Sequence, residues 1–301
     1  MSPTPVPLKP LDQQVIVVFG ASSGIGRATA VLATKRGATV VAAGRDRAAL
    51  ESLVEEAGPG HVVIGTAEVT DEAQVRAIAD LAVERCGRID TWAHVAGVGA
   101  YGRFEDITPE EFRRVIDVDL LGPVHGARAA LPHLRRGGGA YIVVSSEVAK
   151  RGLPLASPYS AAKHGVDGFV EALRVELQHD KVPVSVTQIL PAAITTPFFE
   201  NARTRLGVRP SGPPPVYSPE LVAEAILGAA VRPRRDVVVG GAAKVQLLLQ
   251  RLSPRLMDAF ARAAAFRLQR SKVPKRPGDD ALFEAPVGED RVRGEVTTTR
   301  R

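Results

Sequence analysis

Seven short apolar runs, rich in β-branched residues, alternate with stretches of helical spacing between about residue 13 and residue 240. Most of the runs lack polar alternation, which is expected when helices cover both faces of a parallel sheet. Seven such alternations predict an α/β fold with a doubly wound, seven-stranded parallel sheet and right-handed crossovers. The runs are Val15–Phe19, Thr39–Ala43, His61–Gly65, Ile89–Val95, Tyr141–Val144, Val184–Leu190 and Val237–Val239.

The segments between the runs predict helices, and one long segment has no periodicity. Open sheets of this type bind ligands beyond the carboxyl ends of their strands. Residues 192–217 contain five prolines, and a loop of that length inside a compact domain is usually functional, often a lid. The predicted helices are Gly26–Arg36, Asp71–Cys86, Pro109–Leu134, Tyr159–His179 and Pro219–Ala230.

The sheet pattern stops after Gly241, where apolar residues recur on one helical face. Ser253 and Pro254 then combine a helix N-cap with proline at the first helical position. From about Lys272 the composition is polar, charged and proline-bearing, which predicts mobility. The chain therefore divides into an N-terminal tail (1–12), a main domain (13–240), an amphipathic helical extension (241–271) and a flexible basic and polar tail (272–301).

The single cysteine, Cys86, excludes a disulfide within the chain and a cysteine-based metal site. The proline-rich N-terminus has no apolar core of a secretory signal, and no run approaches the length of a membrane span. The sequence therefore predicts a soluble cytoplasmic protein that needs no metal.

The net charge of +6 lies entirely in residues 241–301, which carry 13 basic and 7 acidic side chains. A basic end could contact nucleic acid or anionic lipid, or be a solvated tail. No zinc-finger or RNA-binding signature accompanies it, so nucleic acid is not expected as a partner. Residues 244–276 leave two alternatives open: peripheral membrane contact, or packing on the core or on a partner subunit.

A glycine-rich turn, Gly20-Ala-Ser-Ser-Gly24-Ile-Gly26, follows the first predicted strand and opens a helix. Gly20 permits a tight turn, while Gly24 and Gly26 let the backbone approach a pyrophosphate. The free N–H groups and the helix dipole favour that charge. The turn therefore predicts a dinucleotide site.

The second predicted strand is followed by Gly44 and Arg45, where an acidic residue would select the ribose 2′-hydroxyl of NAD. A guanidinium offers paired donors to a 2′-phosphate, which a carboxylate would repel. The sequence therefore predicts NADP(H) as the cofactor.

Tyr159 and Lys163 are four residues apart at the start of a predicted helix, so they share one face. A phenol has an unperturbed pKa near 10. A neighbouring ammonium stabilises the phenolate and brings the pKa of Tyr159 towards the working range. The pair predicts a proton-transfer group.

The glycine spacing G-x-x-x-G-x-G, the Tyr-x-x-x-Lys pair and Ser146, thirteen residues before Tyr159, occur in one order. This combination resembles the short-chain dehydrogenase/reductase family over about residues 13–240. The resemblance implies a Rossmann-like fold and a catalytic group in which Ser146 binds the substrate oxygen, Tyr159 transfers the proton and Lys163 also holds the nicotinamide ribose. Ser145 is the alternative to Ser146, but the spacing favours Ser146.

The resemblance also implies the cofactor contacts. Backbone and side chains around the glycine turn would wrap the phosphates and the adenosine ribose, and Glu68-Val69 would replace the family's Asp-Val pair beside the adenine. His94-Val95-Ala96-Gly97 matches an Asn-Asn-Ala-Gly segment, with His94 expected to be a packed, hydrogen-bonded residue. The implied set is Gly20, Ser22, Ser23, Gly24, Ile25, Gly26, Arg45, Glu68, Val69, His94, Ala96, Tyr159, Lys163, Ile194 and Thr196.

Asp119 departs from the family, which usually has an asparagine here to anchor a proton-relay water. A carboxylate can still accept that water's hydrogen bonds, but its charge partly offsets the effect of Lys163 on Tyr159. Two functions follow: an NADP(H)-dependent oxidoreductase acting on a small, apolar ketone, aldehyde or secondary alcohol, or a non-catalytic NADP(H)-binding protein. Retention of all three catalytic side chains favours the enzyme, expected as a homodimer or homotetramer.

Specificity is expected to come from residues 147–157 and from the predicted lid. The lid carries apolar residues that would roof a hydrophobic substrate. It also carries Arg203, Arg205 and Arg209, for which two interpretations are open: pairing with an acidic group of the substrate, or a solvated basic face.

Overall fold

The structure is a computed structural model that describes residue 6 and residues 8–58, 60–276, 278–286 and 288–295. Its centre is a seven-stranded sheet with the order β10-β7-β6-β4-β1-β2-β3, in which all neighbours are parallel. The predicted doubly wound sheet is therefore confirmed. The strands are β1 (Val15–Phe19), β2 (Thr39–Gly44), β3 (Val62–Thr66), β4 (Thr91–His94), β6 (Gly139–Val144), β7 (Val184–Pro191) and β10 (Asp236–Val239).

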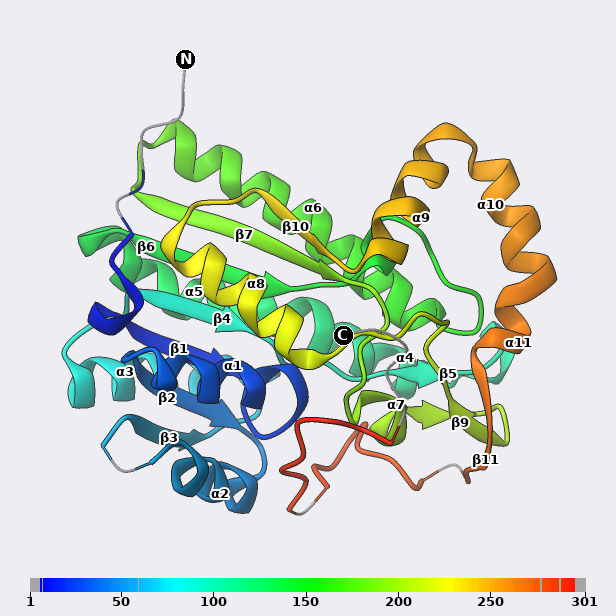
Figure 1. Ribbon diagram of the computed structural model, residues 1–301, viewed down its shortest axis with the longest axis horizontal. Helices are drawn as coiled ribbons and strands as arrows, with labels where there is room; N and C mark the ends of the chain where they lie inside the picture. The colour runs from blue at the N-terminus through cyan, green and yellow to red at the C-terminus, as the bar shows by residue number, and fades with distance from the viewer. Residues whose placement is uncertain (1–5, 7, 59, 277, 287, 296–301) are drawn as a thin grey trace.

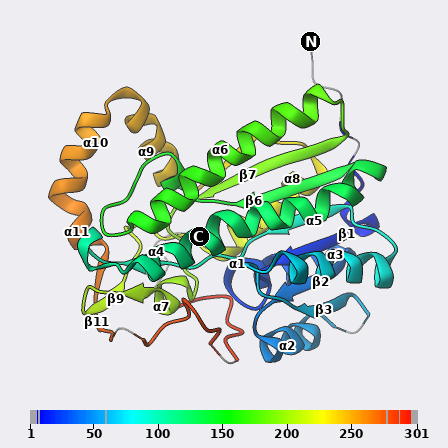
Figure 2. The same ribbon diagram turned by 180° about the vertical axis from the view of Figure 1, so that it is seen from behind.

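Helices cover both faces of this sheet (Figures 1 and 2). α1 and α8 pack together in front of it in Figure 1, while α3, α5 and α6 lie on the face that Figure 2 turns towards the viewer. The sequence predicted these helices but missed α2, whose first turn is capped by Asp46. The helices are α1 (Gly24–Lys35), α2 (Arg47–Ala57), α3 (Glu72–Cys86), α4 (Pro109–Ile116), α5 (Gly122–Gly137), α6 (Ser157–His179) and α8 (Pro219–Val231).

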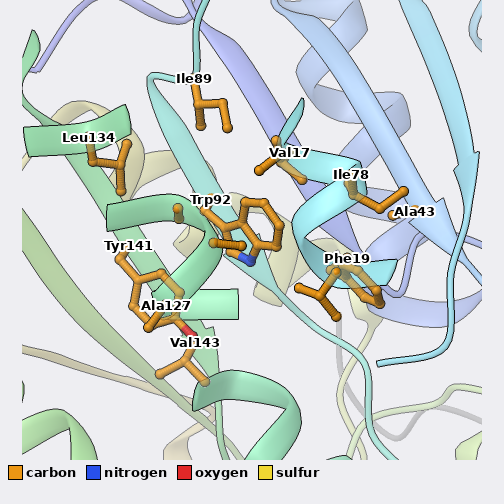
Figure 3. Close-up of a cluster of buried hydrophobic side chains, with 14 of the residues drawn as sticks. Val17, Phe19, Ala43, Ile78, Ile89, Trp92, Ala127, Leu134, Tyr141 and Val143 are labelled. Atoms are coloured by element: carbon orange, nitrogen blue, oxygen red, sulfur yellow. The ribbon is translucent and has the colours of Figure 1, made fainter. Parts of the chain in front are cut away.

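The core is split between the two faces because successive side chains of a strand point in opposite directions. Val17 and Phe19 of β1 face the α3–α5 side with Trp92 and Tyr141 (Figure 3), whereas Ile16 packs on the opposite side. Every residue of β1 is buried. This double burial is why the strands read as continuous apolar runs.

The predicted helix Pro109–Leu134 is two helices joined by a π-helical turn, Asp117–Leu121. A π-turn adds a residue to the helical repeat, and such turns are frequent at functional sites. This turn places Asp119 on the side facing α6, where its carboxylate lies 3.2 Å from the Lys163 amine. The helix prediction was therefore right in extent but missed the irregularity that positions Asp119.

The predicted lid contains short elements rather than one unstructured loop. α7 (Phe198–Asn201) leads into β8 (Arg203–Thr204) and β9 (Val208–Pro210). β8 pairs in parallel with β5 (Ala100–Tyr101). β9 pairs with β11 (Arg270–Pro274), so the C-terminal part of the chain is attached to the lid.

The helical extension forms an arch that stands away from the sheet (Figure 1). It contains α9 (Gly241–Leu252), α10 (Pro254–Phe260), a π-helical turn (Ala261–Ala265) and α11 (Phe266–Leu268). The predicted cap is present, since Ser253 accepts a hydrogen bond from the Leu256 N–H. The apolar face is largely uncovered, so the core does not bury it. Its exposed residues are Val245, Leu248, Leu249, Leu252, Leu256, Phe260 and Phe266.

Residues 278–286 and 288–295, which we name the C-terminal strap, run along the carboxyl end of the sheet beside α7 (Figures 1 and 2). This placement differs from the solvated tail that the composition predicts. The reason is a short apolar group within the polar segment, in which Ala281 and Leu282 are buried. Within the described residues, no helix is long and apolar enough to cross a membrane.

The turn between β1 and α1 requires glycine at two positions. Gly20 has φ +97°, and a Cβ there would lie 2.5 Å from the Ala96 nitrogen. A Cβ on Gly26 would lie only 1.9 Å from the Gly20 carbonyl oxygen. The close approach of helix and turn therefore excludes any side chain at Gly26.

We expect Gly26→Ala to lower the free energy of unfolding by about 1–3 kcal/mol, because the added methyl group must push the helix from the turn. Urea denaturation would measure the loss. Gly228→Ala is the matched control: Gly228 lies in α8 with nothing within 4 Å of an added Cβ. It should be neutral or stabilising by up to about 1 kcal/mol. Equal midpoints for the two variants would contradict the close approach.

Candidate active site

A crevice of about 280 Å³ lies beyond the carboxyl ends of the central strands. Most of the predicted site residues meet there although they come from separate parts of the chain. Asp119 and His94 are the two that do not line it. The predicted residues in its wall are Gly20, Ser22, Ser23, Gly24, Ile25, Gly26, Arg45, Glu68, Val69, Ala96, Ser146, Tyr159, Lys163, Ile194 and Thr196.

The phosphate end of the crevice is the N-terminus of α1. Ser23 is the N-cap and makes no side-chain capping bond, so its side chain leaves the first turn's backbone donors to other acceptors, and the Arg291 carbonyl accepts one of them, the Gly24 N–H. A Cβ on Gly24 would lie 3.3 Å from the Thr196 side chain, which places Thr196 against the turn. These features fit a dinucleotide pyrophosphate.

The adenosine end holds a cluster of opposite charges. Arg45 lies 3.8 Å from the Glu68 carboxylate, and Arg114 lies 2.8 Å from the same group. Both guanidiniums also donate to the strap: Arg45 to the Ala281 carbonyl at 2.9 Å and Arg114 to the Leu282 carbonyl at 2.9 Å. The Arg45 donors are therefore directed at backbone oxygens of the strap.

The strap crosses the rest of the cofactor end. The Gly24 N–H donates to the Arg291 carbonyl at 3.0 Å, and the Glu289 N–H donates to Asp46. Arg291 pairs with Glu200 of α7 at 2.9 Å. The strap thus joins the glycine turn, α2 and the lid into one rim.

His94 lies behind the crevice rather than in it. Its ring stacks on Phe19 with centroids 5.6 Å apart, and it is 1% exposed. Neither ring nitrogen has a hydrogen-bond partner among the described residues. Burial, together with Lys163, lowers the pKa of His94 to about 3, so the ring is neutral. The prediction that His94 is packed agrees with this geometry, whereas its predicted hydrogen bond and its place beside the cofactor do not.

Ser146, Tyr159 and Lys163 come together at the opposite end of the crevice. Ser146 follows β6, and the interaction of its hydroxyl with the phenol lowers the pKa of Tyr159. Lys163, one helical turn after Tyr159 in α6, places its amine 5.3 Å from the centre of the phenol ring. The alternative Ser145 also lines the crevice, but its hydroxyl is buried with no partner within the described ranges.

Asp119 lies behind this group and fixes Lys163. Its carboxylate is fully buried, accepts the Val98 N–H at 2.8 Å and lies 3.2 Å from the lysine amine. Gly97 leaves the space for the pair, since a Cβ there would approach the Asp119 carboxylate to 3.4 Å. Burial raises the pKa of Asp119 in spite of the opposing effect of Lys163. Asp119 is therefore a positioning residue that does not line the crevice.

The environment of Tyr159 holds its phenol in the protonated form. Burial is the largest cause that raises the pKa of Tyr159, and the negative charges of Asp119 and Glu147 raise it further. The hydrogen bond with Ser146 lowers it. The sequence argument considered the ammonium of Lys163 and omitted burial and Glu147, so it gave the wrong direction for this structure.

The lid arginines are engaged within the chain. Arg203 pairs with Glu111 at 2.9 Å and with Asp280 of the strap at 2.5 Å, and Arg205 pairs with Glu111 at 2.6 Å. Arg209 pairs with Glu295 at 2.6 Å. Neither interpretation from the sequence describes them, because they join lid, α4 and strap instead of facing a substrate acid or solvent.

Sequence reasoning missed several residues of the crevice wall. Tyr101 belongs to no recognisable sequence motif. Glu147 lies in residues 147–157, which the sequence analysis linked to substrate specificity without giving any single residue a role. The strap gave one weak signal, the apolar group around Leu282 within a polar segment. The missed strap residues in the wall are Ala281, Ala285, Pro286 and Glu289.

A glycine-lined crevice that ends at a Ser–Tyr–Lys group defines the class of nicotinamide-dependent oxidoreductases. Residues 14–207 match the family described as short chain dehydrogenase. The chain is 42% identical over 291 residues to the uncharacterized oxidoreductase YxnA of Bacillus subtilis (strain 168), covering 95% of this chain and 82% of that protein. The chain therefore belongs to the short-chain dehydrogenase/reductase family, which uses NAD or NADP.

Two further similarities concern proteins with a stated activity or ligand. A 3beta-hydroxysteroid dehydrogenase of Mediterraneibacter gnavus is 35% identical over 202 residues, covering 66% of this chain and 72% of that protein. The fold is also similar to an alcohol dehydrogenase of Thermococcus sibiricus complexed with 5-hydroxy-NADP, with a TM-score of 0.66 and 26% identity. That match covers 75% of this chain and 95% of the other.

We expect Asp119→Asn to retain or increase activity and to shift the pH profile of alcohol oxidation to lower pH. Oxidation needs the phenolate, and Asp119 raises the pKa of Tyr159. Removing that charge lowers the pKa, so the rise in kcat/KM with pH occurs earlier. Initial rates across a pH series would measure the midpoint.

The amide can still accept the Val98 N–H, which keeps the loop in place. Exposed Asp258→Asn, in α10, is the matched control and should leave the profile unchanged. A midpoint that moves to higher pH, or a complete loss of activity, would contradict the electrostatic role of Asp119.

Proposed function

We propose that this protein is an NADP(H)-dependent oxidoreductase that interconverts a ketone or aldehyde and the corresponding alcohol, with Tyr159 as the general acid and base. The observation that carries the proposal is that Ser146, Tyr159 and Lys163 lie in the wall of the same crevice as the glycine turn, with the lysine amine 5.3 Å from the centre of the Tyr159 ring. Proton donor and cofactor cradle thus open onto one space. The non-catalytic alternative leaves this arrangement unexplained.

The residues of the chain have distinct parts in the reaction. Bound nicotinamide supplies or accepts a hydride at the reacting carbon. Ser146 and Tyr159 hold the substrate oxygen, and Tyr159 donates its phenolic proton to that oxygen during reduction or takes one back during oxidation. Lys163 stabilises the negative charge that then develops on the phenol.

The preference for NADP(H) rests on Arg45 and on the absence of an acidic residue at Gly44. A 2′-phosphate would compete with two backbone carbonyls of the strap, at Ala281 and Phe283, for the Arg45 donors. A charged phosphate is a stronger acceptor than a neutral carbonyl. The structural neighbour complexed with 5-hydroxy-NADP supports the same preference.

The substrate proposed is small and has an apolar body. Leu153, Tyr101, Phe198 and Phe199 line the crevice near Tyr159, and the Phe198 ring packs against the Tyr159 ring at a tilt of 56° with centroids 5.5 Å apart. The lid arginines are paired internally, so an acidic substrate group finds no free cation among them. The relative named as a hydroxysteroid dehydrogenase is consistent with an apolar alcohol.

We also propose a homodimer or homotetramer assembled through α4–α5 and α6, as the family resemblance implies. Val175 of α6 is 63% exposed and Leu121 is 40% exposed, so these helices offer apolar side chains to a second copy. The exposed face of α9 and α10 offers another surface for a partner subunit or a membrane.

Tyr159→Phe should reduce kcat/KM for carbonyl reduction by at least about a thousandfold, because the ring is retained while the proton donor is lost. NADPH binding, followed by fluorescence titration, should change little. Tyr217→Phe is the matched control, since Tyr217 lies outside the crevice wall and its hydroxyl bonds to the Ala242 N–H. Turnover by Tyr159→Phe at the parent rate would refute the proton-transfer role.

Arg45→Ala should weaken NADPH binding by about ten- to a hundredfold, the value of a hydrogen bond to a charged group, and leave NADH binding nearly unchanged. Fluorescence titration with both nucleotides would measure the difference. Arg47→Ala is the control, because Arg47 is exposed and, among the described residues, forms an ion pair with Glu51 alone. An equal loss for NADPH and NADH would mean that Arg45 acts by holding the strap and not by binding the phosphate.

A further inference from the structure

Glu147 is a buried carboxyl group that forms no ion pair within the part of the chain that the structure describes. The residue is 8% exposed, and its Oε2 atom is buried without a hydrogen-bond partner among the described residues. No described lysine, arginine or histidine forms an ion pair with it. Burial alone raises the pKa of Glu147 to about 7.

Each of the other buried carboxyl groups that the structure describes has a cation or a backbone N–H beside it, although the Oδ2 atom of Asp119 makes no hydrogen bond. Asp90 pairs with Lys9 and Arg88, and Glu111 pairs with Arg203 and Arg205. Asp119 lies beside Lys163, and Asp46 caps α2. Buried acidic groups are normally paired because an unpaired one loses its hydration without compensation. Glu147 is therefore the exception. Because it lies in the crevice wall, a ligand bound in the crevice could supply the missing hydrogen-bond donor.

Glu147 lies in the wall of the crevice beside the reacting groups. It directly follows Ser146, whose hydroxyl accepts the Val148 N–H at 3.1 Å and so fixes the turn. Glu147 and Tyr159 both line this crevice, and the charge of Glu147 is one of the causes that raise the pKa of Tyr159. Leu153 and Phe198 of the same wall are apolar. A ligand that fills this end of the crevice would meet one unsatisfied carboxyl group among apolar side chains.

We propose that Glu147 binds a hydrogen-bond donor of the substrate, a hydroxyl or an amine, located a few bonds from the carbon that is oxidised or reduced. This inference rests on the proposed function and deepens it: the substrate class becomes carbonyl compounds and alcohols with an apolar body and a second, donating polar group. Such a donor replaces the water that the carboxyl group has lost, whereas a purely apolar substrate leaves it unsatisfied.

The test uses matched alcohols of one ring size in the oxidation direction with NADP⁺. Cyclohexanol carries no donor besides the reacting hydroxyl, the 1,2-, 1,3- and 1,4-cyclohexanediols add a neutral donor, and 2- and 4-aminocyclohexanol add a cationic one. The wild-type enzyme should prefer at least one donor-bearing alcohol to cyclohexanol by about tenfold or more in kcat/KM. Thermal shift of the NADP⁺ complex should rank the ligands in the same order.

Glu147→Leu should lower this preference by about ten- to a hundredfold, and Glu147→Gln separates the two kinds of donor. The amide keeps an acceptor oxygen and removes the charge, so it should retain much of a hydroxyl preference and lose an amine preference. The ratio of kcat/KM values removes any rate change that a variant imposes on all alcohols alike, and the thermal shift of the NADP⁺ complexes measures binding of the donor without proton transfer.

Two outcomes would overturn the proposal: a wild-type enzyme with no preference for any donor-bearing alcohol in either turnover or binding, or variants in which the preference persists. Failure of the proposed function looks different, because Tyr159→Phe would then oxidise cyclohexanol as fast as the wild type. Glu171→Leu, an exposed residue of α6, is the matched control and should keep the wild-type ratio.

Discussion

The buried pair of Asp119 and Lys163 connects the parts of the molecule that the chemistry needs together. The lysine belongs to α6 and approaches the Val144 carbonyl at the end of β6, and the aspartate holds the Val98 N–H of the loop after β4. A buried charge without its partner is strongly destabilising. The pair therefore holds α6, the π-helical turn and the ends of two strands in fixed relative positions. Tyr159 lies in α6 one turn before Lys163, so the same contacts position its phenol.

The backbone carbonyls of the strap occupy the Arg45 donors that the proposed 2′-phosphate would use. In the structure these donors are directed at the Ala281 and Phe283 carbonyls. The strap is also attached to the lid by the ion pair of Asp280 with Arg203. Binding of the proposed 2′-phosphate to Arg45 would therefore be coupled to the positions of strap and lid. NADH, which lacks that phosphate, is for this reason the reference when Arg45 is changed.

The sequence predicts those features that depend on local pattern. The seven strands were found within one or two residues at most ends because burial on both faces makes each an apolar run, and Tyr159 met Lys163 because a helix brings residues four apart together. The strap contacts could not be predicted, since Arg45 and Ala281 are 236 residues apart. That Glu147 forms no ion pair with a described residue could not be predicted either, because it depends on where the lysine and arginine side chains lie in the folded chain.

The two carboxyl groups around Tyr159 act on it in the same direction but differ in what satisfies them. Asp119 has a cation beside it and is sealed from the crevice, so its effect on the phenol is permanent. Glu147 lines the crevice and pairs with no cation among the described residues, so its effect depends on the ligand. A donor or cation bound to Glu147 reduces the field that raises the pKa of Tyr159. Substrate recognition and proton transfer are thereby linked: the ligand that satisfies Glu147 also makes the phenol a better acid.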